Sequence, residues 1–192
     1  MSSPSDRQLR ADARRNRDRL LAAAHDAFRR HGVSASLDDV ARNAGVGIGT
    51  LYRHFPTRED LIAALVDTDL ERVAALADDL ARDDADDGLE RWLVELVAHT
   101  ATYRGLADAV LTATNDRTAF GGACERVHAA GAALVRREQE RGVVRPDIEP
   151  GDVIDIANAI AWATEDARDL GRRRRLVRIS VDGLRTPRAD RG

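Results

Sequence analysis

Residues 47 to 54 of this sequence, GIGTLYRH, gather hydrogen-bond donors at a spacing that suits contact with a polyanion. The donors are Thr50, Tyr52, Arg53 and His54. Each can donate to a phosphate oxygen, and Arg53 can also reach a base edge. Gly47 and Gly49 project no side chain, so the backbone can approach a partner closely there. The predicted chemistry is electrostatic recognition rather than covalent catalysis.

A second candidate for chemistry is the pair Cys124 and His128, one helical turn apart. A thiol beside an imidazole could serve as nucleophile and base, but no orienting carboxylate or oxyanion-donor loop accompanies it. Metal binding with His99 as a third ligand would need a fourth group, and no HxxxH or CxxC spacing is present. Residues 83 to 88, DDADDG, lack the alternating spacing and the closing Glu of a calcium loop. The sequence therefore predicts no catalytic site, no metal and no cofactor.

The elements that position the donors begin with a helix that Ser36 can cap, with Asp39 in the capping-box position. Gly45 suits the left-handed conformation that ends such a helix. A second short helix, from Ile48 to Phe55, is stopped by Pro56, which cannot continue a helix without a clash. Two short helices joined by a tight turn containing Gly form the helix-turn-helix pattern.

Residues 44 to 61, AGVGIGTLYRHFPTREDL, resemble the DNA-binding signature of the TetR family of one-component bacterial transcription regulators. The resemblance implies an all-α fold of about nine helices, with an N-terminal three-helix helix-turn-helix domain and a C-terminal helical ligand-binding and dimerisation domain. It implies DNA contacts from Arg14, Arg17, Ser36, Gly47, Ile48, Gly49, Thr50, Tyr52, Arg53, His54 and Arg58. Gly47 and Ile48 depart from the polar residues common in the family, so the operator sequence is not implied. An ordinary three-helix cluster that buries an aromatic pair is the alternative.

Composition is consistent with one basic surface on an acidic protein. Residues 1 to 60 hold 11 Arg and 8 acidic residues, a net of +3, and the remaining 132 residues carry −6. Such a distribution leaves one phosphate-facing surface and limits nonspecific binding elsewhere. A single cysteine excludes an internal disulfide framework, and no apolar run of transmembrane length or signal-peptide pattern is present. We expect a cytoplasmic protein that does not bind membranes.

The expected organisation has four parts: a flexible arm at 1–11, the helix-turn-helix domain at 12–56, a helical effector-binding and dimerisation domain at 57–186, and a disordered tail at 187–192. Arg7 and Arg10 of the arm could reach an adjacent groove, although a solvated tail is the simpler interpretation. Apolar spacing and Gly or Pro breaks predict the other helices over 12–31, 57–83, 89–103, 106–112, a long stretch ending near 141, 152–170 and a last one ending near 184.

The segments RWLVELVAHTATYRGL and RRRRLVRISVDGLRTP resemble the SbtR-like C-terminal domain of a TetR subgroup. The resemblance implies that the last two helices pair with their copies in a four-helix dimer bundle, and apolar, small-residue stripes suit that role. The predicted interface residues are Ile156, Ala157, Ile160, Ala161, Val177, Val181 and Leu184. A two-fold dimer would double the contacted DNA into a palindromic site.

Polar side chains on apolar helical faces predict a small-molecule pocket in the second half of the chain. His99 and Tyr103 lie four residues apart and share a helix face. The predicted lining is Trp92, Leu96, His99, Tyr103, Phe120, Cys124, His128 and Trp162. A mostly apolar cavity with a few directional polar groups is the usual composition of such a site. The alternative is that each polar residue is hydrogen-bonded in an ordinary core or exposed.

Together these features predict a homodimeric transcription regulator that is not an enzyme. It would be a repressor, released from a palindromic double-stranded DNA operator when an unidentified small-molecule effector fills the C-terminal domain. Release requires that the effector bind the DNA-incompetent state more tightly than the competent one. Two alternatives stay open: a constitutive helix-turn-helix DNA binder without an effector, and a helical enzyme that uses Cys124 and His128.

Overall fold

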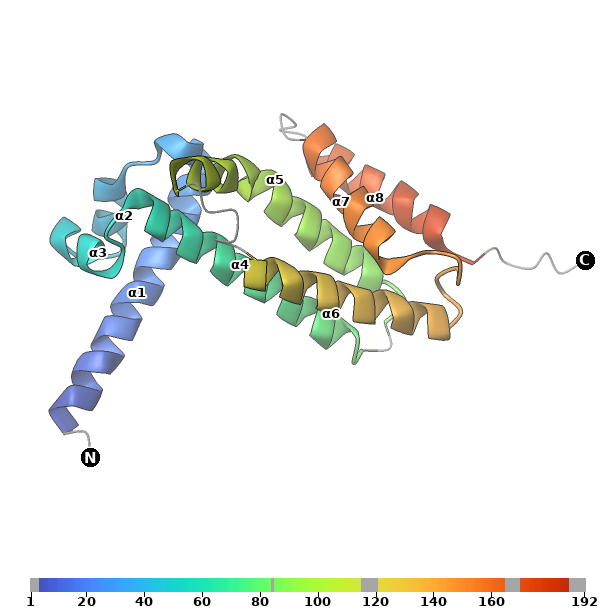
Figure 1. Cartoon of the computed structure of the whole chain (residues 1–192), viewed down its shortest axis with the longest axis horizontal. Coiled ribbons are helices and arrows are strands. Elements are labelled where there is room, and N and C mark those ends of the chain that lie inside the picture. Colours follow the sequence, from blue (N-terminus) through green and yellow to red (C-terminus); the bar gives the residue numbers. More distant parts are fainter. Residues whose placement is uncertain (1–3, 84, 115–120, 165–169, 187–192) are drawn as a thin grey trace, which may run out of the picture. The chain divides into compact units, whose positions relative to one another are not determined.

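The computed structural model describes residues 4–83, 85–114, 121–164 and 170–186 (Figure 1). Within these ranges the only β feature is an isolated bridge between Val144 and Arg185. The helices are α1 (Pro4–His31), the 3₁₀ turn η1 (Gly32–Ser34), α2 (Leu37–Asn43), α3 (Ile48–His54), α4 (Arg58–Leu80), α5 (Gly88–Thr114), α6 (Gly121–Glu140), α7 (Pro150–Ala163) and α8 (Leu170–Leu184). The predicted all-α fold is confirmed. None of the helices in these ranges combines the length and apolar character needed to cross a bilayer.

Two helices differ from the prediction. Helix α1 begins at Pro4, so the expected flexible arm over residues 1–11 is helical from its fourth residue. Proline is favoured at the first helical position, and the Arg, Gln, Leu and Ala residues that follow are good helix formers. Helix α5 runs unbroken through Gly105, which merges the two helices expected at 89–103 and 106–112. One interior glycine costs only about 1 kcal/mol, too little to end a long helix. The described residues therefore hold eight α-helices rather than about nine. The tail expected at 187–192 lies outside the described residues.

The chain divides into two compact units. Unit 1 comprises residues 1–67 with 105–119, and unit 2 comprises residues 68–104 with 120–192. The division falls inside α4 and α5 rather than at the expected boundary after residue 56. The buried residues Leu61, Ile62 and Leu65 of α4 are therefore part of unit 1.

Unit 1 is built on an apolar core beneath the helix-turn-helix. Its buried residues from α1 to α3 are Leu20, Leu21, Ala24, Ala27, Phe28, Ala35, Leu37, Val40, Ala41, Ala44, Leu51 and Phe55. An arginine guanidinium also lies over each of two aromatic rings in this unit. The Arg17 guanidinium lies 5.5 Å from the Phe55 ring centre, and that of Arg58 lies 5.9 Å from the Phe28 ring centre. Both distances are typical of cation–π contacts, which fix α1 and the start of α4 to the core.

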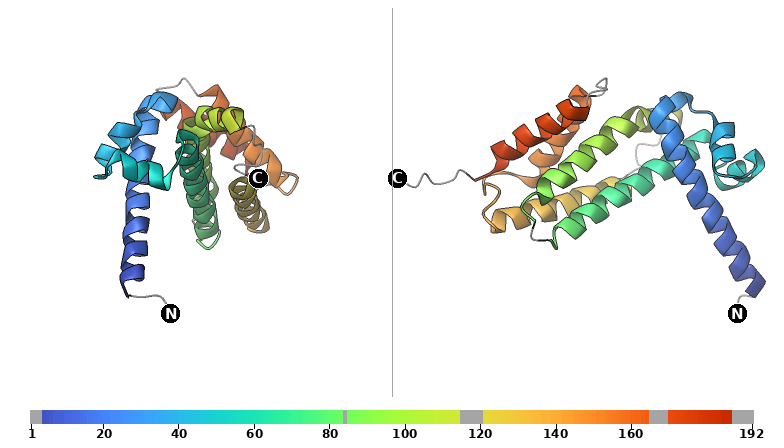
Figure 2. Two further views of the ribbon diagram at one scale, coloured as in Figure 1. Left: turned by 60° about the vertical axis from the view of Figure 1, so that its left-hand side comes forward. Right: turned by 180° about the vertical axis from the view of Figure 1, so that it is seen from behind.

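Unit 2 contains the rest of α4 and α5 with α6, α7 and α8, and α7 lies side by side with α8 (Figure 2). Trp92 is fully buried in this unit and donates its indole N–H to the carbonyl of Val73 at 3.1 Å. Gly131 of α6 lies directly under the Trp92 ring, because a Cβ at residue 131 would overlap ring atoms Cη2 and Cζ2. The close packing of α5 on α6 therefore depends on the missing side chain at Gly131.

Arginines at the end of α6 contact the acidic run that follows α4. Glu138 is only 1% exposed and accepts hydrogen bonds from Arg141 at 3.0 and 3.2 Å. The hydrogen bond to Glu138 raises the pKa of the Arg141 guanidinium. Arg141 also pairs with Asp86 at 2.8 Å, and Arg137 donates to the carbonyl of Asp83 at 2.7 Å. The acidic run that follows α4 is thus engaged by arginines of α6 and its end.

Two arginines near the start of α8 cap the C-terminal end of α7. Arg172 donates to the carbonyl of Ala163 at 3.3 Å, and Arg173 donates to the carbonyl of Thr164 at 3.4 Å. Burial lowers the pKa of the Arg173 guanidinium. Side chains that donate to the last carbonyls of a helix complement its negative end. These contacts hold the end of α7 against the start of α8.

The contact between Gly131 and Trp92 predicts a sharp effect of a single methyl group. Gly131→Ala should lower the free energy of unfolding by about 1–3 kcal/mol, the usual cost of overpacking a core. Gly105→Ala is the matched control, since Gly105 is also helical and a Cβ there would meet nothing within 4 Å. The control should raise stability by about 0.5–1 kcal/mol. Urea denaturation at one protein concentration measures both, and equal midpoints for the two variants would contradict the packing described here.

Candidate nucleic-acid interface

The start of α2 is capped as predicted, but only in one direction. The backbone N–H of Asp39 donates to Ser36 Oγ at 3.3 Å. The Asp39 carboxylate accepts from Arg42 at 2.7 Å, so it is turned along α2 and a return bond to the Ser36 backbone is not formed. A side-chain cap of this kind stabilises a helix by about 1 kcal/mol.

The turn after α2 has the geometry that Gly45 predicts. Gly45 has a φ of +67°, in the left-handed region that favours glycine. The N–H of Gly45 donates to the carbonyl of Arg42 at 3.0 Å, and the N–H of Val46 donates to that of Ala41 at 3.0 Å. This pair of bonds is the Schellman motif, which satisfies the last carbonyls of a helix and sets the exit direction of the chain.

Helix α3 buries one side and exposes the predicted donors on the other. Leu51 and Phe55 are buried, and the N–H of Phe55 closes the helix with a 2.8 Å bond to the carbonyl of Leu51. Tyr52 is 48% exposed. Arg53 is folded back along α3, with Nε 3.3 Å from the Gly49 carbonyl oxygen and Nη2 3.1 Å from Thr50 Oγ1. The helix therefore presents a hydroxyl-bearing and cationic outer face.

The other predicted DNA contacts are also accessible, and all of them lie in unit 1. Those with exposed side chains or backbone are Arg14, Arg17, Ser36, Gly47, Ile48 and Gly49. Thr50, His54 and Arg58 are half-buried. The structure thus places the predicted set on α1, on the cap of α2, on α3 and at the start of α4.

The start of α4 is fixed directly after α3 by a complete capping box. The N–H of Thr57 donates to Asp60 Oδ2 at 3.0 Å, and the N–H of Asp60 donates to Thr57 Oγ1 at 3.0 Å. The reciprocal pair satisfies two N–H groups that a helix start leaves unpaired. With Pro56 between them, α3 and α4 are separate helices with a short, defined connection.

Half of the residues predicted to line a pocket are buried together in unit 2. Trp92, Leu96, His99 and Tyr103 all lie on the buried side of α5. The His99 and Tyr103 rings have centres 5.0 Å apart. His99 Nδ1 is 3.8 Å from Asp69 Oδ2, and within the described residues this nitrogen makes no hydrogen bond. Asp69 was not predicted, although its spacing of four from Leu65 and from Val73 places it on the buried face of α4.

The structure does not bring the remaining pocket candidates into this interior. Cys124, His128 and Trp162 are exposed, and Phe120 lies outside the described residues. The buried face of α6 is instead formed by Ala123, Val127, Ala130 and Leu134. Two of these four residues are alanines, whose small side chains allow close helix packing, and Ala123 and Val127 each lie one position before the predicted Cys124 and His128. Among the described residues no group of three or more His, Cys, Asp or Glu is arranged to hold a metal ion.

Most of the predicted dimer-interface residues are inside the subunit. Ala157, Ala161, Val177, Val181 and Leu184 are all buried. Their expected role at a dimer interface is corrected: they pack α7 and α8 within unit 2, because an amphipathic helix must first bury its most apolar stripe in its own core. Ile156 and Ile160 are half-buried and accessible in part.

Large apolar side chains are nevertheless exposed on the same two helices. They are Trp162, Leu170 and Ile179, with exposures of 65%, 66% and 67%. These side chains give α7 and α8 exposed apolar surface in addition to the residues that they bury in unit 2.

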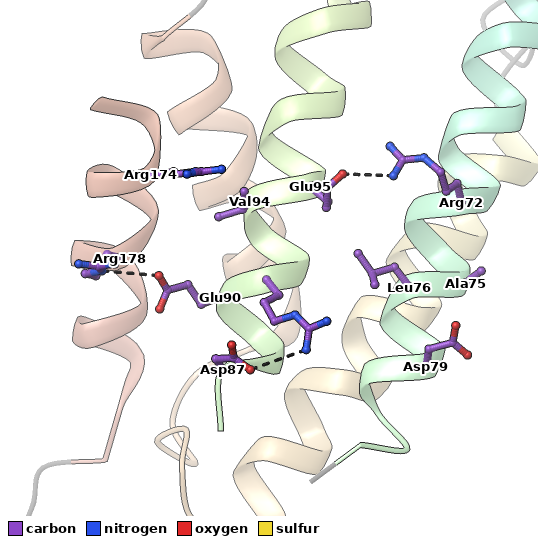
Figure 3. A pocket seen from close by; sticks show the side chains of 11 residues that line it. Arg72, Ala75, Leu76, Asp79, Asp87, Glu90, Val94, Glu95, Arg174 and Arg178 are labelled. Carbon is purple, nitrogen blue, oxygen red and sulfur yellow. Dashed lines mark hydrogen bonds and ion pairs between the residues drawn. The ribbon is translucent and has the colours of Figure 1, made fainter. Parts of the chain in front are cut away.

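A groove of about 840 Å³ runs along α4, α5 and α8 of unit 2 (Figure 3). Arg72 reaches across it to Glu95 at 3.2 Å, and Arg178 pairs with Glu90 at 3.6 Å. Burial alone would lower the pKa of the Arg72 guanidinium. Hydrogen bonds to Glu95 and Asp69 and the charges of these two carboxylates have the larger combined effect, so the pKa of Arg72 is raised. The groove is lined by Arg72, Ala75, Leu76, Asp79, Asp87, Glu90, Arg91, Val94, Glu95, Arg174 and Arg178. Its charged walls differ from the apolar pocket that the sequence predicted.

Comparisons with known proteins agree with this arrangement. Residues 20–65 match the family model for bacterial regulatory proteins of the tetR family, and residues 84–186 match that for the SbtR-like transcriptional regulator C-terminal domain. The HTH-type transcriptional regulator EthR of Mycolicibacterium smegmatis is 29% identical over 137 residues, which cover 68% of this chain and 62% of EthR. The match therefore spans less than two thirds of that relative.

Two solved structures are similar over most of the chain. The TetR transcriptional regulator SCO0520 from Streptomyces coelicolor has 33% identity and a TM-score of 0.78, covering 90% of this chain and 99% of that one. A TetR regulatory protein from Mycobacterium vanbaalenii has 33% identity and a TM-score of 0.72, covering 93% and 99%. Because one family model covers the helix-turn-helix and the other covers more than half of the 192 residues, the chain belongs to the TetR family of bacterial regulatory proteins, with an SbtR-like C-terminal domain.

Proposed function

We propose that this chain is a homodimeric, cytoplasmic repressor of transcription that leaves a palindromic DNA operator when a small-molecule effector binds in unit 2. The observation that carries the proposal is the exposed donor face of α3, on a helix-turn-helix whose residues match the TetR family model. The similar proteins EthR and SCO0520 are named as transcriptional regulators, which supports the same function.

The side chains of α3 divide into two roles on DNA. Tyr52, Thr50 and His54 carry single donors that suit phosphate oxygens, and such contacts set the register of the protein without reading sequence. Arg53 can reach a guanine edge once it leaves its contacts with Gly49 and Thr50. Because phosphate contacts dominate, affinity should fall steeply as salt rises.

Tyr52→Phe tests the phosphate role. The change removes one hydroxyl and keeps the exposed ring, so binding to every DNA sequence should weaken alike, by about 1.5–3 kcal/mol for a hydrogen bond to a charged group. Fluorescence anisotropy with the operator and with an unrelated duplex measures both affinities. An unchanged thermal midpoint shows that the fold is intact. A shift in preferred sequence, rather than a uniform loss, would contradict the assignment.

Dimerisation is proposed through the exposed apolar stripe of α7 and α8. Ile179 is 67% exposed on α8, and Ile156 and Ile160 of α7 are accessible in part. Exposed apolar residues on two adjacent helices suit a four-helix bundle with a second copy of the chain, and a two-fold dimer matches a palindromic site.

Ile179→Glu should convert the dimer to a monomer, because it would place two carboxylates in an apolar interface. Leu9→Glu is the matched control: Leu9 is 63% exposed, on α1 of unit 1. Sedimentation equilibrium measures the mass of each variant. Dimers of normal stability for Ile179→Glu, or monomers for both variants, would place the interface elsewhere.

The effector site is proposed in the interior of unit 2 beside His99. A switch from 99% to 1% operator-competent protein needs about 5.5 kcal/mol of differential binding. Exposed ion pairs such as those of the charged groove contribute only about 0–1 kcal/mol each. Burying about 220 Å² of apolar ligand surface would supply the difference at roughly 25 cal/mol per Å². Trp92 and Leu96 provide apolar surroundings, and His99 Nδ1 provides an unsatisfied polar atom for orientation.

His99→Phe tests this site. A chemically diverse compound library is first screened by thermal shift, and the compounds that also weaken operator binding are kept. Those compounds should bind the variant at least tenfold more weakly, because the lost hydrogen bond contributes about 1.4 kcal/mol or more. Operator affinity without effector should stay unchanged. If no compound class stabilises the parent protein, the constitutive DNA binder without an effector is the better interpretation.

A further inference from the structure

Helix α1 extends well beyond the helix-turn-helix. The family model for the DNA-binding domain begins at residue 20, whereas α1 begins at Pro4. We call residues 4–19 the helical extension. Residues 7–15 are all exposed, and in Figures 1 and 2 this part of α1 projects past α2 and α3 of the same unit. Among residues 7–19 no side chain is buried, and the first buried residue of α1 is Leu20.

Four arginines form a single stripe along the helical extension. Arg7, Arg10, Arg14 and Arg17 follow at intervals of three, four and three residues. At 3.6 residues per turn these intervals place all four within an arc of about 80°. Asp18 borders the stripe at its inner end.

The remaining charges of the helical extension lie off this arc. Arg15 and Arg19 fall on other sides of the helix, and Arg15 pairs there with Asp12. The stripe is thus a cationic face whose arc is bordered by Asp6 on one side and by Asp18 on the other.

The stripe is aligned with the recognition helix by its last member. The Arg17 guanidinium rests on the ring of Phe55, the residue that ends α3. The face that carries Arg17 is therefore the face of α1 that meets α3. From that contact the stripe leads outward over Arg14, Arg10 and Arg7, away from the donors on α3.

We propose that the helical extension is a second DNA-binding surface, whose arginine stripe contacts the sugar-phosphate backbone outside the stretch contacted by α3. This inference rests on the proposed DNA-binding function and adds a surface that the family model does not cover. The occupant is duplex DNA because the stripe is cationic, begins beside the end of α3 at the Arg17–Phe55 contact, and has no apolar neighbours on its arc within the helical extension.

The dimensions fit this role. Ten residues separate Arg7 from Arg17, which is roughly 15 Å of helix. DNA advances roughly 3.4 Å per base pair, so the stripe runs beside about four base pairs. An unpacked helix of this length is only marginally stable in water, and phosphate contacts along one face would stabilise it further. The extension would thereby raise the affinity of a protein whose net charge is only −3 overall.

The experiment compares two charge-matched double variants of the full-length protein. R7Q/R10Q removes two arginines from the stripe, and R15Q/R19Q removes two from the other sides of the same helix. Arg and Gln have similar helix propensities, so circular dichroism should show equal helix content. The probes are a 40-base-pair duplex carrying the operator selected in vitro by the parent protein, and a random duplex of equal length. Affinity is measured over a range of KCl concentrations.

R7Q/R10Q should flatten the slope of log affinity against log salt by roughly 3.6 for a dimer, at about 0.9 for each lost phosphate contact. The loss should be the same on both duplexes, and R7K/R10K should restore it, because the contact depends on charge rather than on base recognition. R15Q/R19Q should keep the parental slope.

Equal slopes for R7Q/R10Q and the parent would overturn the inference while leaving DNA binding by α3 intact. An equal loss in both double variants would also overturn it, since general charge rather than the stripe would then be responsible. If the parent itself shows no salt-dependent DNA binding, and Tyr52→Phe is equally without effect, the proposed function fails and the inference fails with it.

Discussion

The left-handed turn at Gly45 is the constraint on which the rest of unit 1 depends. It ends α2 with two backbone hydrogen bonds and directs the chain into α3, so that Leu51 and Phe55 enter the core and Tyr52 stays outside. A residue with a Cβ would resist this conformation. The core that the turn creates then organises its neighbours through aromatic contacts, because Phe55 receives Arg17 of α1. The position of one glycine thereby influences both the donor face of α3 and the orientation of the arginine stripe.

Unit 2 holds polar side chains in two different environments, a charged groove and an apolar interior. The groove along α4, α5 and α8 is lined by arginines and carboxylates. These groups form ion pairs that are exposed to water, and each such pair contributes little to the free energy of folding or binding. The interior beside Trp92 holds few polar groups, and an unmet hydrogen-bonding atom there costs about 1–3 kcal/mol. A ligand that satisfies His99 while burying apolar surface gains from both effects. For this reason the interior, rather than the charged groove, is the stronger candidate for a control site.

Helices α4 and α5 each contribute residues to both units, so the units share continuous backbone at two places. In the proposed mechanism an effector in unit 2 would act on unit 1 through these helices, and its differential affinity for two arrangements would set the size of the response. The start of α4 is held by the Thr57–Asp60 capping box, which would transmit a displacement of α4 directly to the end of α3. The tight contact of Trp92 on Gly131 would limit the arrangements that α5 can adopt against α6.

The sequence by itself determined the features that depend on residues a few positions apart. Ser36, Gly45 and the Thr57–Asp60 pair act within one turn of the chain, so the helix-turn-helix, its caps and its donor residues could be read directly. Only the tertiary structure decided which stripe of each amphipathic helix is buried. Ala123 rather than Cys124 faces the core of α6, because periodicity specifies a face only to within one position when neighbouring residues are also apolar. On α8 the sequence identified the apolar stripe of Val177, Val181 and Leu184, and only the structure shows that this stripe packs inside unit 2. The continuity of α5 through Gly105, and the neighbourhood of Asp69 and His99 on different helices, likewise depend on packing between segments far apart in the chain.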